Sequence, residues 1–266
     1  MEQYKYIKLL TKNLHHRNFQ WKFGRNDIEN FNYSNECTSN ALYVCEPKDF
    51  FEWMFLYEDI CWVAYATIPE DAEHVIMNSK VKASSVILHE PLIPIAEFIP
   101  IAVNAGADIN ARDGYVLRQA CEFGRLDIIK SLFENGANIH ACDNYPVCGA
   151  SITLLMASAN GHLEVVKLLM EHGMNVHAQD DYALRRASSN GYFEIVKYLV
   201  EHGANIHAYD DEALRYAAYN DHLDVVKYLV EKGADIYTQN DYALRWASAN
   251  GRLDMVEYLK EQRSKK

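Results

Sequence analysis

The chain has 266 residues, of which 49% are hydrophobic, and a formal net charge of −11. This length allows one large or two ordinary domains, and the apolar content suffices for a buried core, so disorder is excluded as the main state. Acids outnumber bases by 14 to 9 in residues 1–97 and by 23 to 17 in residues 98–266. The charge therefore disfavours phosphate binding as the main activity, and we expect no nucleic-acid partner.

Cysteine usage and hydropathy indicate the compartment. The six cysteines form no C-x-x-C pair, and nothing at the N-terminus resembles a secretory signal. Residues 60–68 (ICWVAYATI) are the longest fully apolar run, about half of the ~20 residues that a membrane-spanning helix needs. We therefore expect a reducing intracellular compartment, no membrane partner, and a buried strand in this run.

Residues 1–97 are predicted to form a small mixed α+β domain. In chain order, the patterns predict a helix in YKYIKLLTKNL, a strand in ALYVC, a helix in KDFFEWMF, a strand in ICWVAYATI and a strand in VKASSVIL. Residues 46–73 hold eight acids with Lys48 as the single base, which is typical of a solvated acidic face. Three roles stay open for this region: a cap for the remainder of the chain, an independent partner-binding module docking through the acidic stretch, or an enzyme.

From residue 98 onward the chain repeats itself. A glycine that precedes an A-N-I, A-D-I or M-N-V triplet recurs at spacings of 30, 37, 30 and 30, at Gly106, Gly136, Gly173, Gly203 and Gly233. A fixed period in this range is typical of a solenoid, in which each helix pair buries its apolar face by stacking on its neighbours. The predicted units are a half unit in 98–113, full units in 114–143, 144–180, 181–210 and 211–240, and a C-terminal cap in 241–266.

Each unit is predicted to hold two helices. Aspartates precede the A-L-R triplets and are expected to cap the first helix, at Asp181, Asp211 and Asp241. The second helix carries a one-sided apolar stripe, for example Ile195, Val196, Leu199 and Val200, and a glycine follows its end. In the half unit, Pro100 is expected in the first turn of its helix.

Residues 161–178 (GHLEVVKLLMEHGMNVHA) resemble the second half of an ankyrin repeat, and residues 191–208 and 221–238 do the same. The resemblance covers about two thirds of the chain. It implies an α solenoid of ankyrin repeats behind a small α+β domain, and a protein-recognition module that uses loop tips and the exposed face of the first helix. More loosely, the whole chain resembles ankyrin repeat proteins encoded by giant DNA viruses of the mimivirus type. That implies a host or viral protein partner and a location in the host cytoplasm or the virion.

The units depart from the usual repeat in two ways. They are 30 residues long where about 33 is usual, and V-L-R or A-L-R stands in place of T-P-L-H. The resulting arginine ladder is predicted to be structural and to pair with acids of neighbouring units at Asp143, Asp180, Asp210 and Asp211; the alternative is a receptor for acidic peptide or phosphate. Its members are Arg118, Arg185, Arg215 and Arg245.

The unit 144–180 has seven extra residues within NYPVCGASIT (144–153). They are predicted to form one long finger in a loop between units, which often lies on the binding face of a repeat array. A neutral surface insertion is the alternative, because a longer loop costs little closure entropy.

The candidate partner-binding residues are those that differ between repeat units whose other positions are alike. The residue after each ladder position differs from unit to unit, being Gln119, Met156, Arg186, Tyr216 and Trp246. Varied, bulky positions are free to contact a partner, and Tyr, Trp and Arg are enriched at binding hot spots. The alternative is that some tyrosines only cover the helices beneath. The full set of candidates is Met156, Tyr182, Arg186, Tyr209, Tyr216, Tyr219, Tyr242 and Trp246.

Metal, cofactor and catalytic sites are not expected. His140, His177 and His207 recur at one position, but zinc ligands must meet at ~2.1 Å from one ion whereas stacked helices lie about 8–10 Å apart. No P-loop, G-x-S-x-G, H-E-x-x-H or Rossmann glycine pattern occurs. The predicted function is a non-catalytic scaffold or adaptor; the alternatives are a substrate adaptor for a host ubiquitin ligase and an enzyme in residues 1–97.

Overall fold

A computed structural model describes residues 4–11, 14–16, 19–28, 42–54, 60–77, 79–141 and 152–264. By its internal contacts the chain divides into two compact parts, each much larger than a repeat unit. The first comprises residues 1–120 and 127–141, and the second comprises residues 121–126 and 142–266.

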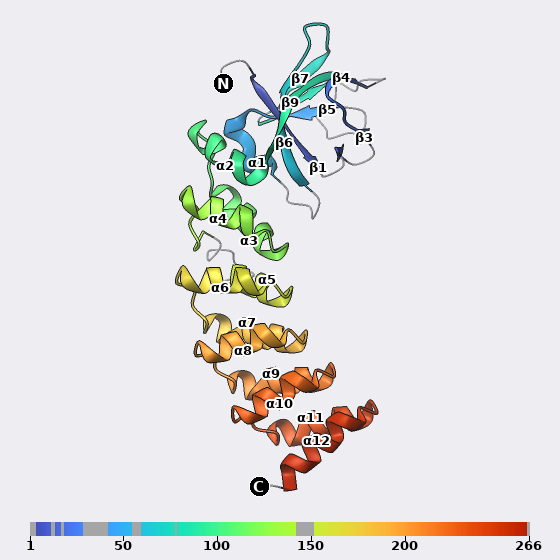
Figure 1. The fold of residues 1–266 in the computed structure, drawn as a ribbon, viewed down its shortest axis with the longest axis vertical. Helices are drawn as coiled ribbons and strands as arrows, with labels where there is room; N and C mark the ends of the chain where they lie inside the picture. The colour runs from blue at the N-terminus through green and yellow to red at the C-terminus, as the bar shows by residue number, and fades with distance from the viewer. Residues whose placement is uncertain are drawn as a thin grey trace. The chain divides into compact units, whose positions relative to one another are not determined.

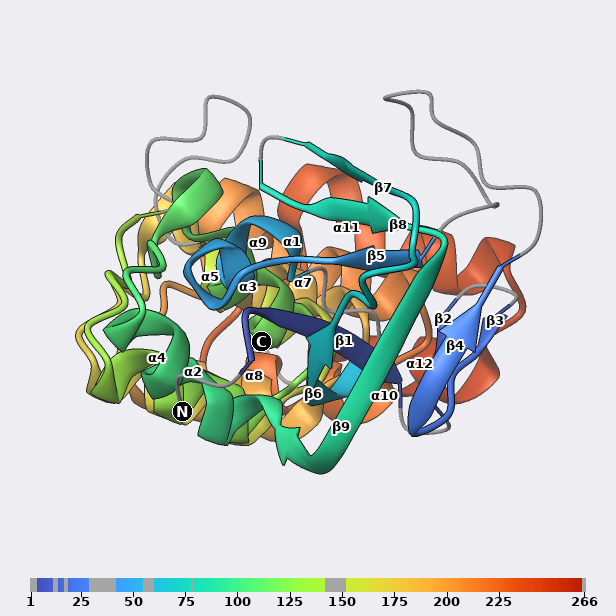
Figure 2. The ribbon, with the colours of Figure 1, turned by 90° about the horizontal axis from the view of Figure 1, so that it is seen from above.

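Antiparallel sheets form most of the N-terminal region. A four-stranded sheet has the order β1-β6-β9-β4, a three-stranded sheet the order β5-β8-β7, and β2 pairs with β3. Figure 2 shows β1, β6 and β9 running side by side through this region. The strands are β1 (Tyr6–Thr11), β2 (His15–His16), β3 (Phe19–Gln20), β4 (Gly24–Asp27), β5 (Leu42–Val44), β6 (Ile60–Thr67), β7 (His74–Ile76), β8 (Val81–Ala83) and β9 (Ser85–Pro94).

The first predicted helix is a strand, so that prediction was wrong. β1 pairs with β6 in a register that joins Tyr6 to Ala66 and Leu10 to Trp62. Lysine and leucine favour helices by intrinsic propensity, but the strand is selected by this long-range pairing, which supplies the backbone hydrogen bonds and buries Ile7 completely. The strands predicted in ALYVC and ICWVAYATI are confirmed as β5 and β6. VKASSVIL contains two strands, β8 and β9, which are separated by Ser84.

The helix predicted in KDFFEWMF is confirmed over its described part, as a 3-10 turn η1 (Pro47–Asp49) followed by α1 (Phe50–Trp53). The Phe50 ring is fully buried and lies 5.1 Å from the ring of Phe98, centroid to centroid. Phe98 belongs to α2 (Ile95–Asn104), which directly follows β9. Phe50, Phe51 and Phe98 therefore pack into one core.

Pro100 lies inside α2 and not in its first turn, contrary to the prediction. The helix begins at Ile95 because its apolar stripe of Ile95, Phe98, Ile99 and Ala102 must be buried as a whole. Proline has no N–H, so the Ala96 carbonyl loses its usual helical donor. The Ser131 hydroxyl, on α4 (Leu126–Glu134), donates to that carbonyl with an oxygen–oxygen distance of 2.6 Å.

Replacing Ser131 by alanine should lower the free energy of unfolding by about 1–2 kcal/mol, because the partly buried Ala96 carbonyl loses its donor. Urea denaturation followed by circular dichroism measures this loss. In a Pro100→Ala background the cost of Ser131→Ala should shrink, since the backbone N–H at position 100 is restored. The same cost in both backgrounds would contradict the account of this hydrogen bond.

Helix pairs make up the rest of the chain. Figure 1 shows α5 to α12 as successive antiparallel pairs of similar length. Within the described residues, no helix is long and apolar enough to cross a membrane. The helices are α3 (Ala111–Glu122), α5 (Ile152–Ala159), α6 (Leu163–Glu171), α7 (Ala178–Ser189), α8 (Phe193–Glu201), α9 (Ala208–Tyr219), α10 (Leu223–Glu231), α11 (Thr238–Ala249) and α12 (Leu253–Ser264).

The predicted features of the second helix are confirmed in α8. Ile195, Val196 and Leu199 are at most 2% exposed. Past the helix end Gly203 has φ +96°, and its N–H donates to the Val200 carbonyl while the next N–H reaches the Leu199 carbonyl. These bonds form a Schellman motif, which satisfies helix-terminal carbonyls and favours glycine.

The first helices α3, α7, α9 and α11 open with a left-handed turn that the sequence did not suggest. In α7 the residues Gln179, Asp180 and Asp181 have φ between +54° and +58°, and the right-handed helix begins at Tyr182. Residues 112–114, 209–211 and 239–241 repeat this conformation. Side chains other than glycine adopt it rarely, so neighbouring contacts must hold it in place. Residues 144–151 of the predicted long finger (144–153) lie outside the described residues, as does Asp143, and its last two residues, Ile152 and Thr153, belong to α5.

Candidate protein-binding face

The first helices α7, α9 and α11 present one register position outward. Arg186, Tyr216 and Trp246 are exposed, and Met156 is half-buried. The alanine one residue further along, for example Ala187, is fully buried. Since neighbouring helical residues point about 100° apart, burial of the alanine directs the preceding side chain outward. Three of the four predicted positions therefore lie on the surface, and we name this surface the first-helix face.

Four aromatic rings on α9 and α11 form a continuous cluster. Tyr219 and Trp246 meet edge to face with ring centroids 5.1 Å apart, and Tyr216 and Tyr242 lie 6.5 Å and 5.9 Å from these two rings respectively. Edge-to-face packing of this kind stabilises aromatic pairs. Burial raises the pKa of the Tyr242 phenol, and nearby Tyr216 adds to the effect. Tyr216, Tyr219, Tyr242 and Trp246 are the aromatic cluster.

The aromatic cluster stays accessible although its rings pack together. Tyr216 is 39% exposed, Tyr219 42% and Trp246 37%. Exposed rings that are already fixed by neighbours lose little conformational freedom when a partner covers them, and this lowers the cost of binding. The cluster joins two units that follow each other in the chain.

A second group lies around Arg185, on α7. Its guanidinium is placed between the rings of Tyr182 and Tyr209, 4.7 Å and 4.4 Å from their centroids. Its Nη1 donates to Glu212 Oε2 at 2.8 Å, and the residue is only 9% exposed. Tyr209 itself is 58% exposed, whereas Tyr182 is half-buried. Of this pair of predicted tyrosines, Tyr209 is the more available to a partner.

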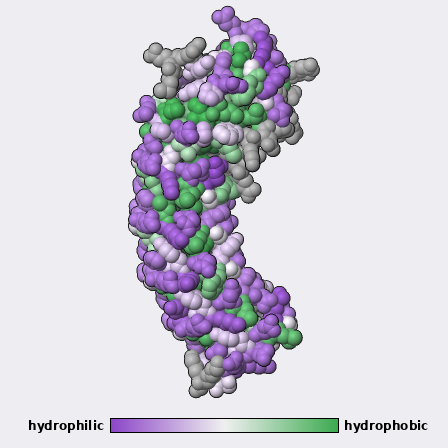
Figure 3. Space-filling view, viewed as in Figure 1, coloured by the Kyte–Doolittle hydropathy of each residue, from purple (hydrophilic) through white to green (hydrophobic). Residues whose placement is uncertain are grey.

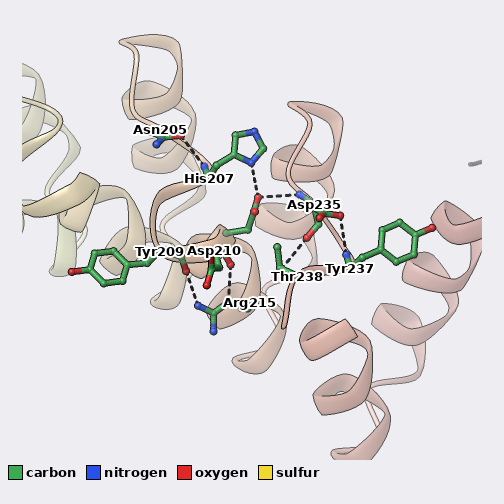
Figure 4. Close-up of polar contacts among 9 residues, drawn as sticks. Asn205, His207, Tyr209, Asp210, Arg215, Asp235, Tyr237 and Thr238 are labelled. Atoms are coloured by element: carbon green, nitrogen blue, oxygen red, sulfur yellow. Dashed lines mark hydrogen bonds and ion pairs between the residues drawn. The ribbon is translucent and has the colours of Figure 1, made fainter. Parts of the chain in front are cut away.

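The arginine ladder donates to backbone carbonyls of the left-handed turns. Arg215 Nε reaches the Asp210 carbonyl at 2.9 Å, and its Nη2 reaches the Tyr209 carbonyl at 2.8 Å, as Figure 4 shows. Arg185 makes the same two contacts with residues 180 and 179, Arg245 reaches the Gln239 carbonyl, and Arg118 lies 3.5 Å from the Arg112 carbonyl.

The predicted pairing of the ladder with aspartate carboxylates was therefore wrong for the described residues. Left-handed residues cannot place their carbonyls in the hydrogen-bond pattern of the following helix, so these oxygens need an external donor. The arginine fork supplies it. The carboxylate of Asp210 instead accepts a hydrogen bond from Gln239 Nε2.

Comparison with known families identifies the helix pairs. Residues 117–210 match the family described as ankyrin repeats in three copies, and residues 214–259 match ankyrin repeats in many copies. The repeat region is an ankyrin repeat array. Together the two matches cover just over half of the chain. No curated protein matched it, so the resemblance to giant-virus proteins stays a prediction.

Ankyrin repeats serve in general as protein-interaction scaffolds and are generally non-catalytic. The exposed surface of the array fits that use. Figure 3 shows hydrophobic residues interspersed with hydrophilic ones over the face in view. Such a mixed composition is typical of interfaces between proteins that also exist apart.

Aspartates of the left-handed turns join consecutive ankyrin units. Asp211, only 3% exposed, accepts hydrogen bonds from His207 Nδ1 at 3.0 Å and from the Asp235 backbone N–H at 2.9 Å. Asp181 accepts the same pair of bonds from His177 and Asn205. The helix-capping prediction was wrong, because an N-cap residue has an extended backbone whereas these aspartates are left-handed.

The recurring histidines take part in these links between ankyrin units. His177 and His207 hold the buried aspartates of their own turns. Within the described part of the chain, no group of three or more His, Cys, Asp and Glu side chains is arranged to hold a metal ion.

In the ankyrin array, aromatic or imidazole rings lie directly against glycines, a contact that the sequence analysis did not predict. A Cβ atom built on Gly191 would lie 2.4 Å from the His222 ring, and one built on Gly161 would lie 2.5 Å from the Tyr192 ring. Each ring belongs to the next unit. A recurring glycine that is followed 31 residues later by a ring is the signal that could have revealed it.

Proposed function

We propose that this chain is a non-catalytic scaffold or adaptor that binds another protein through the first-helix face of its ankyrin array. The observation that carries the proposal is the aromatic cluster, whose rings are packed in fixed positions and yet stay exposed. Tyrosine and tryptophan dominate the energetics of protein interfaces. Arg186 and Tyr209 extend the same face along α7 and α9.

The partner we propose is a host or viral protein, in keeping with the resemblance to giant-virus ankyrin proteins. The proposed site of action is the host cytoplasm. The variation of one register position among Met156, Arg186, Tyr216 and Trp246 supports a single specific partner, because each unit then offers it a different side chain.

The triple variant Arg186→Ala, Tyr216→Ala, Trp246→Ala should abolish capture of the partner from cell extract. Its free energy of unfolding should change by only about 1–2 kcal/mol, because the three side chains are exposed and lose mainly ring contacts. Affinity capture with quantitative mass spectrometry measures the first effect, and circular dichroism with thermal melting measures the second.

A matched triple on the second helices is the control. Lys197→Ala, Lys227→Ala and Glu257→Ala change exposed residues of the same three units on the other helix of each pair, and should leave capture intact. If the first-helix triple still captures the partner, or if both triples lose it equally, the assignment of this face is wrong.

A further inference from the structure

Arg185 shows how a ladder arginine is completed in this fold. Two of its nitrogens hold the carbonyls of its left-handed turn at 3.0 Å, and Nη1 donates to the Glu212 carboxylate of the next unit at 2.8 Å. The ring of Tyr209 lies against the guanidinium. All three guanidinium nitrogens of Arg185 therefore donate to oxygen atoms, Nε and Nη2 to backbone carbonyls and Nη1 to a carboxylate.

Arg215 has the same place in the following unit but lacks the carboxylate. Its Nε and Nη2 hold the carbonyls of its own turn at 2.9 Å and 2.8 Å. Thirty residues after Glu212, where the equivalent carboxylate would stand, the chain has Tyr242, whose ring centroid lies 5.3 Å from the guanidinium. Within the described residues, no carboxylate pairs with Arg215. Nη1 of Arg215, the equivalent of the Arg185 nitrogen that donates to Glu212, can therefore donate to a carboxylate from another molecule.

The aromatic cluster continues directly from this arginine. Tyr242 contacts both Arg215 and Trp246, so the cation and the exposed rings form one surface. Arg186 and Arg245 are exposed on the same series of first helices and add positive charge, although the chain as a whole is acidic. Two acids near Arg215 have other partners, Glu212 with Arg185 and Asp210 with Gln239.

We propose that the first-helix face takes an acidic protein segment, with a carboxylate of the partner on Arg215 in the place that Glu212 has on Arg185, and a neighbouring apolar side chain of the partner on the aromatic cluster. This rests on the proposed function and specifies its partner. An arginine fork favours a planar carboxylate through paired, charge-assisted hydrogen bonds, which gives geometric as well as electrostatic selectivity.

Random-peptide display on the immobilised full chain supplies the probe. Peptides selected on the wild type should be enriched in Asp or Glu beside an aromatic or aliphatic residue. In the strongest peptide, replacing the acid by its amide should weaken binding to the wild type about tenfold, as expected for loss of one hydrogen bond to a charged group. The same replacement should cost nothing further on Arg215→Gln.

Two substitutions at one position separate the carboxylate site from the ring. Tyr242→Glu places a carboxylate where Glu212 stands in the preceding unit, so it should occupy Arg215 internally and abolish the preference for the acidic peptide. Tyr242→Gln loses the same ring and should keep that preference. Thermal melting shows whether Tyr242→Glu and Tyr242→Gln stay folded, so that loss of the preference in the glutamate variant alone can be assigned to the carboxylate on Arg215.

Each contrary result has a distinct meaning. Four results would overturn the carboxylate site alone. They are no enrichment of acidic peptides, an equal loss of affinity from acid to amide on the wild type and on Arg215→Gln, a loss of the acid preference on Arg186→Gln as large as on Arg215→Gln, and competition by inorganic phosphate. Peptides that still bind the Arg186, Tyr216 and Trp246 triple variant would instead reject the first-helix face, and with it the proposed function. A library that yields no peptide on the wild type rejects both.

Discussion

Gly191→Ala should lower the free energy of unfolding by about 2–4 kcal/mol, although it adds a single methyl group. Gly191 has φ +75°, where alanine is strained, and the added Cβ would meet the His222 ring at 2.4 Å. The ring must move to admit it, and then loses its contact between Nε2 and the Ser189 carbonyl. Urea denaturation of the full chain, followed by circular dichroism at 222 nm, measures the loss.

Gly251→Ala is the matched control for this effect. Gly251 has the same place in its unit and a φ of +67°, but nothing lies within 4 Å of its Cβ position. Only the backbone strain of a left-handed alanine applies, about 1 kcal/mol. The difference between the two variants therefore isolates the contact between units. Equal losses would show that the His222 ring yields freely and that the close approach carries no stability.

Asp211→Ala should lower the free energy of unfolding by about 2–3 kcal/mol. The carboxylate is buried and accepts hydrogen bonds from the His207 ring, which belongs to the preceding unit, and from the Asp235 backbone N–H in the loop between α10 and α11. Removing it leaves the partly buried Asp235 N–H without its acceptor, which costs more than the hydrogen bond itself contributed. Denaturant unfolding measures the loss, and hydrogen exchange at the Asp235 amide should accelerate because this amide loses its acceptor.

Asp241→Ala is the corresponding control. Asp241 is left-handed like Asp211, so the backbone effect is shared. Its carboxylate pairs with Arg263 at 3.2 Å, and both side chains are partly exposed, which limits the contribution of the pair to about 0–1 kcal/mol. If Asp241→Ala proves as costly as Asp211→Ala, the contact between units is not the source of the stability.

The array itself was predictable because its information is local and repeated. The 30-residue period, the apolar stripe that includes Ile195 and Leu199, and the glycine after the second helix each follow from neighbours within one unit. The outward placement of Tyr216 and Trp246 followed from the same helical period. Residues 1–97 were harder, because β1 forms by pairing with distant parts of the chain, with β6 along its length and with Cys45 at Ile7.

The predictions about polar side chains failed where a partner belongs to another unit. The sequence placed Asp211 beside a helix start and Arg215 beside aspartates, and nearness along the chain suggested caps and ion pairs. In the structure, the carbonyls of the left-handed turn accept hydrogen bonds from the arginine, and the aspartate of the turn accepts one from the backbone of the following loop.

The sequence alone determined the repeat, its period and the outward face, because helix periodicity and glycine conformation are properties of a few adjacent residues. The tertiary structure decided which polar groups meet across units. It alone revealed that Gly191 leaves room for the His222 ring, and that one unit later the equivalent residues, Asp221 and Arg252, form an ion pair. It also revealed that Arg215 has Tyr242 where Arg185 has the carboxylate of Glu212. Those contacts depend on how the units stack, and stacking brings together residues about thirty positions apart that no local pattern relates.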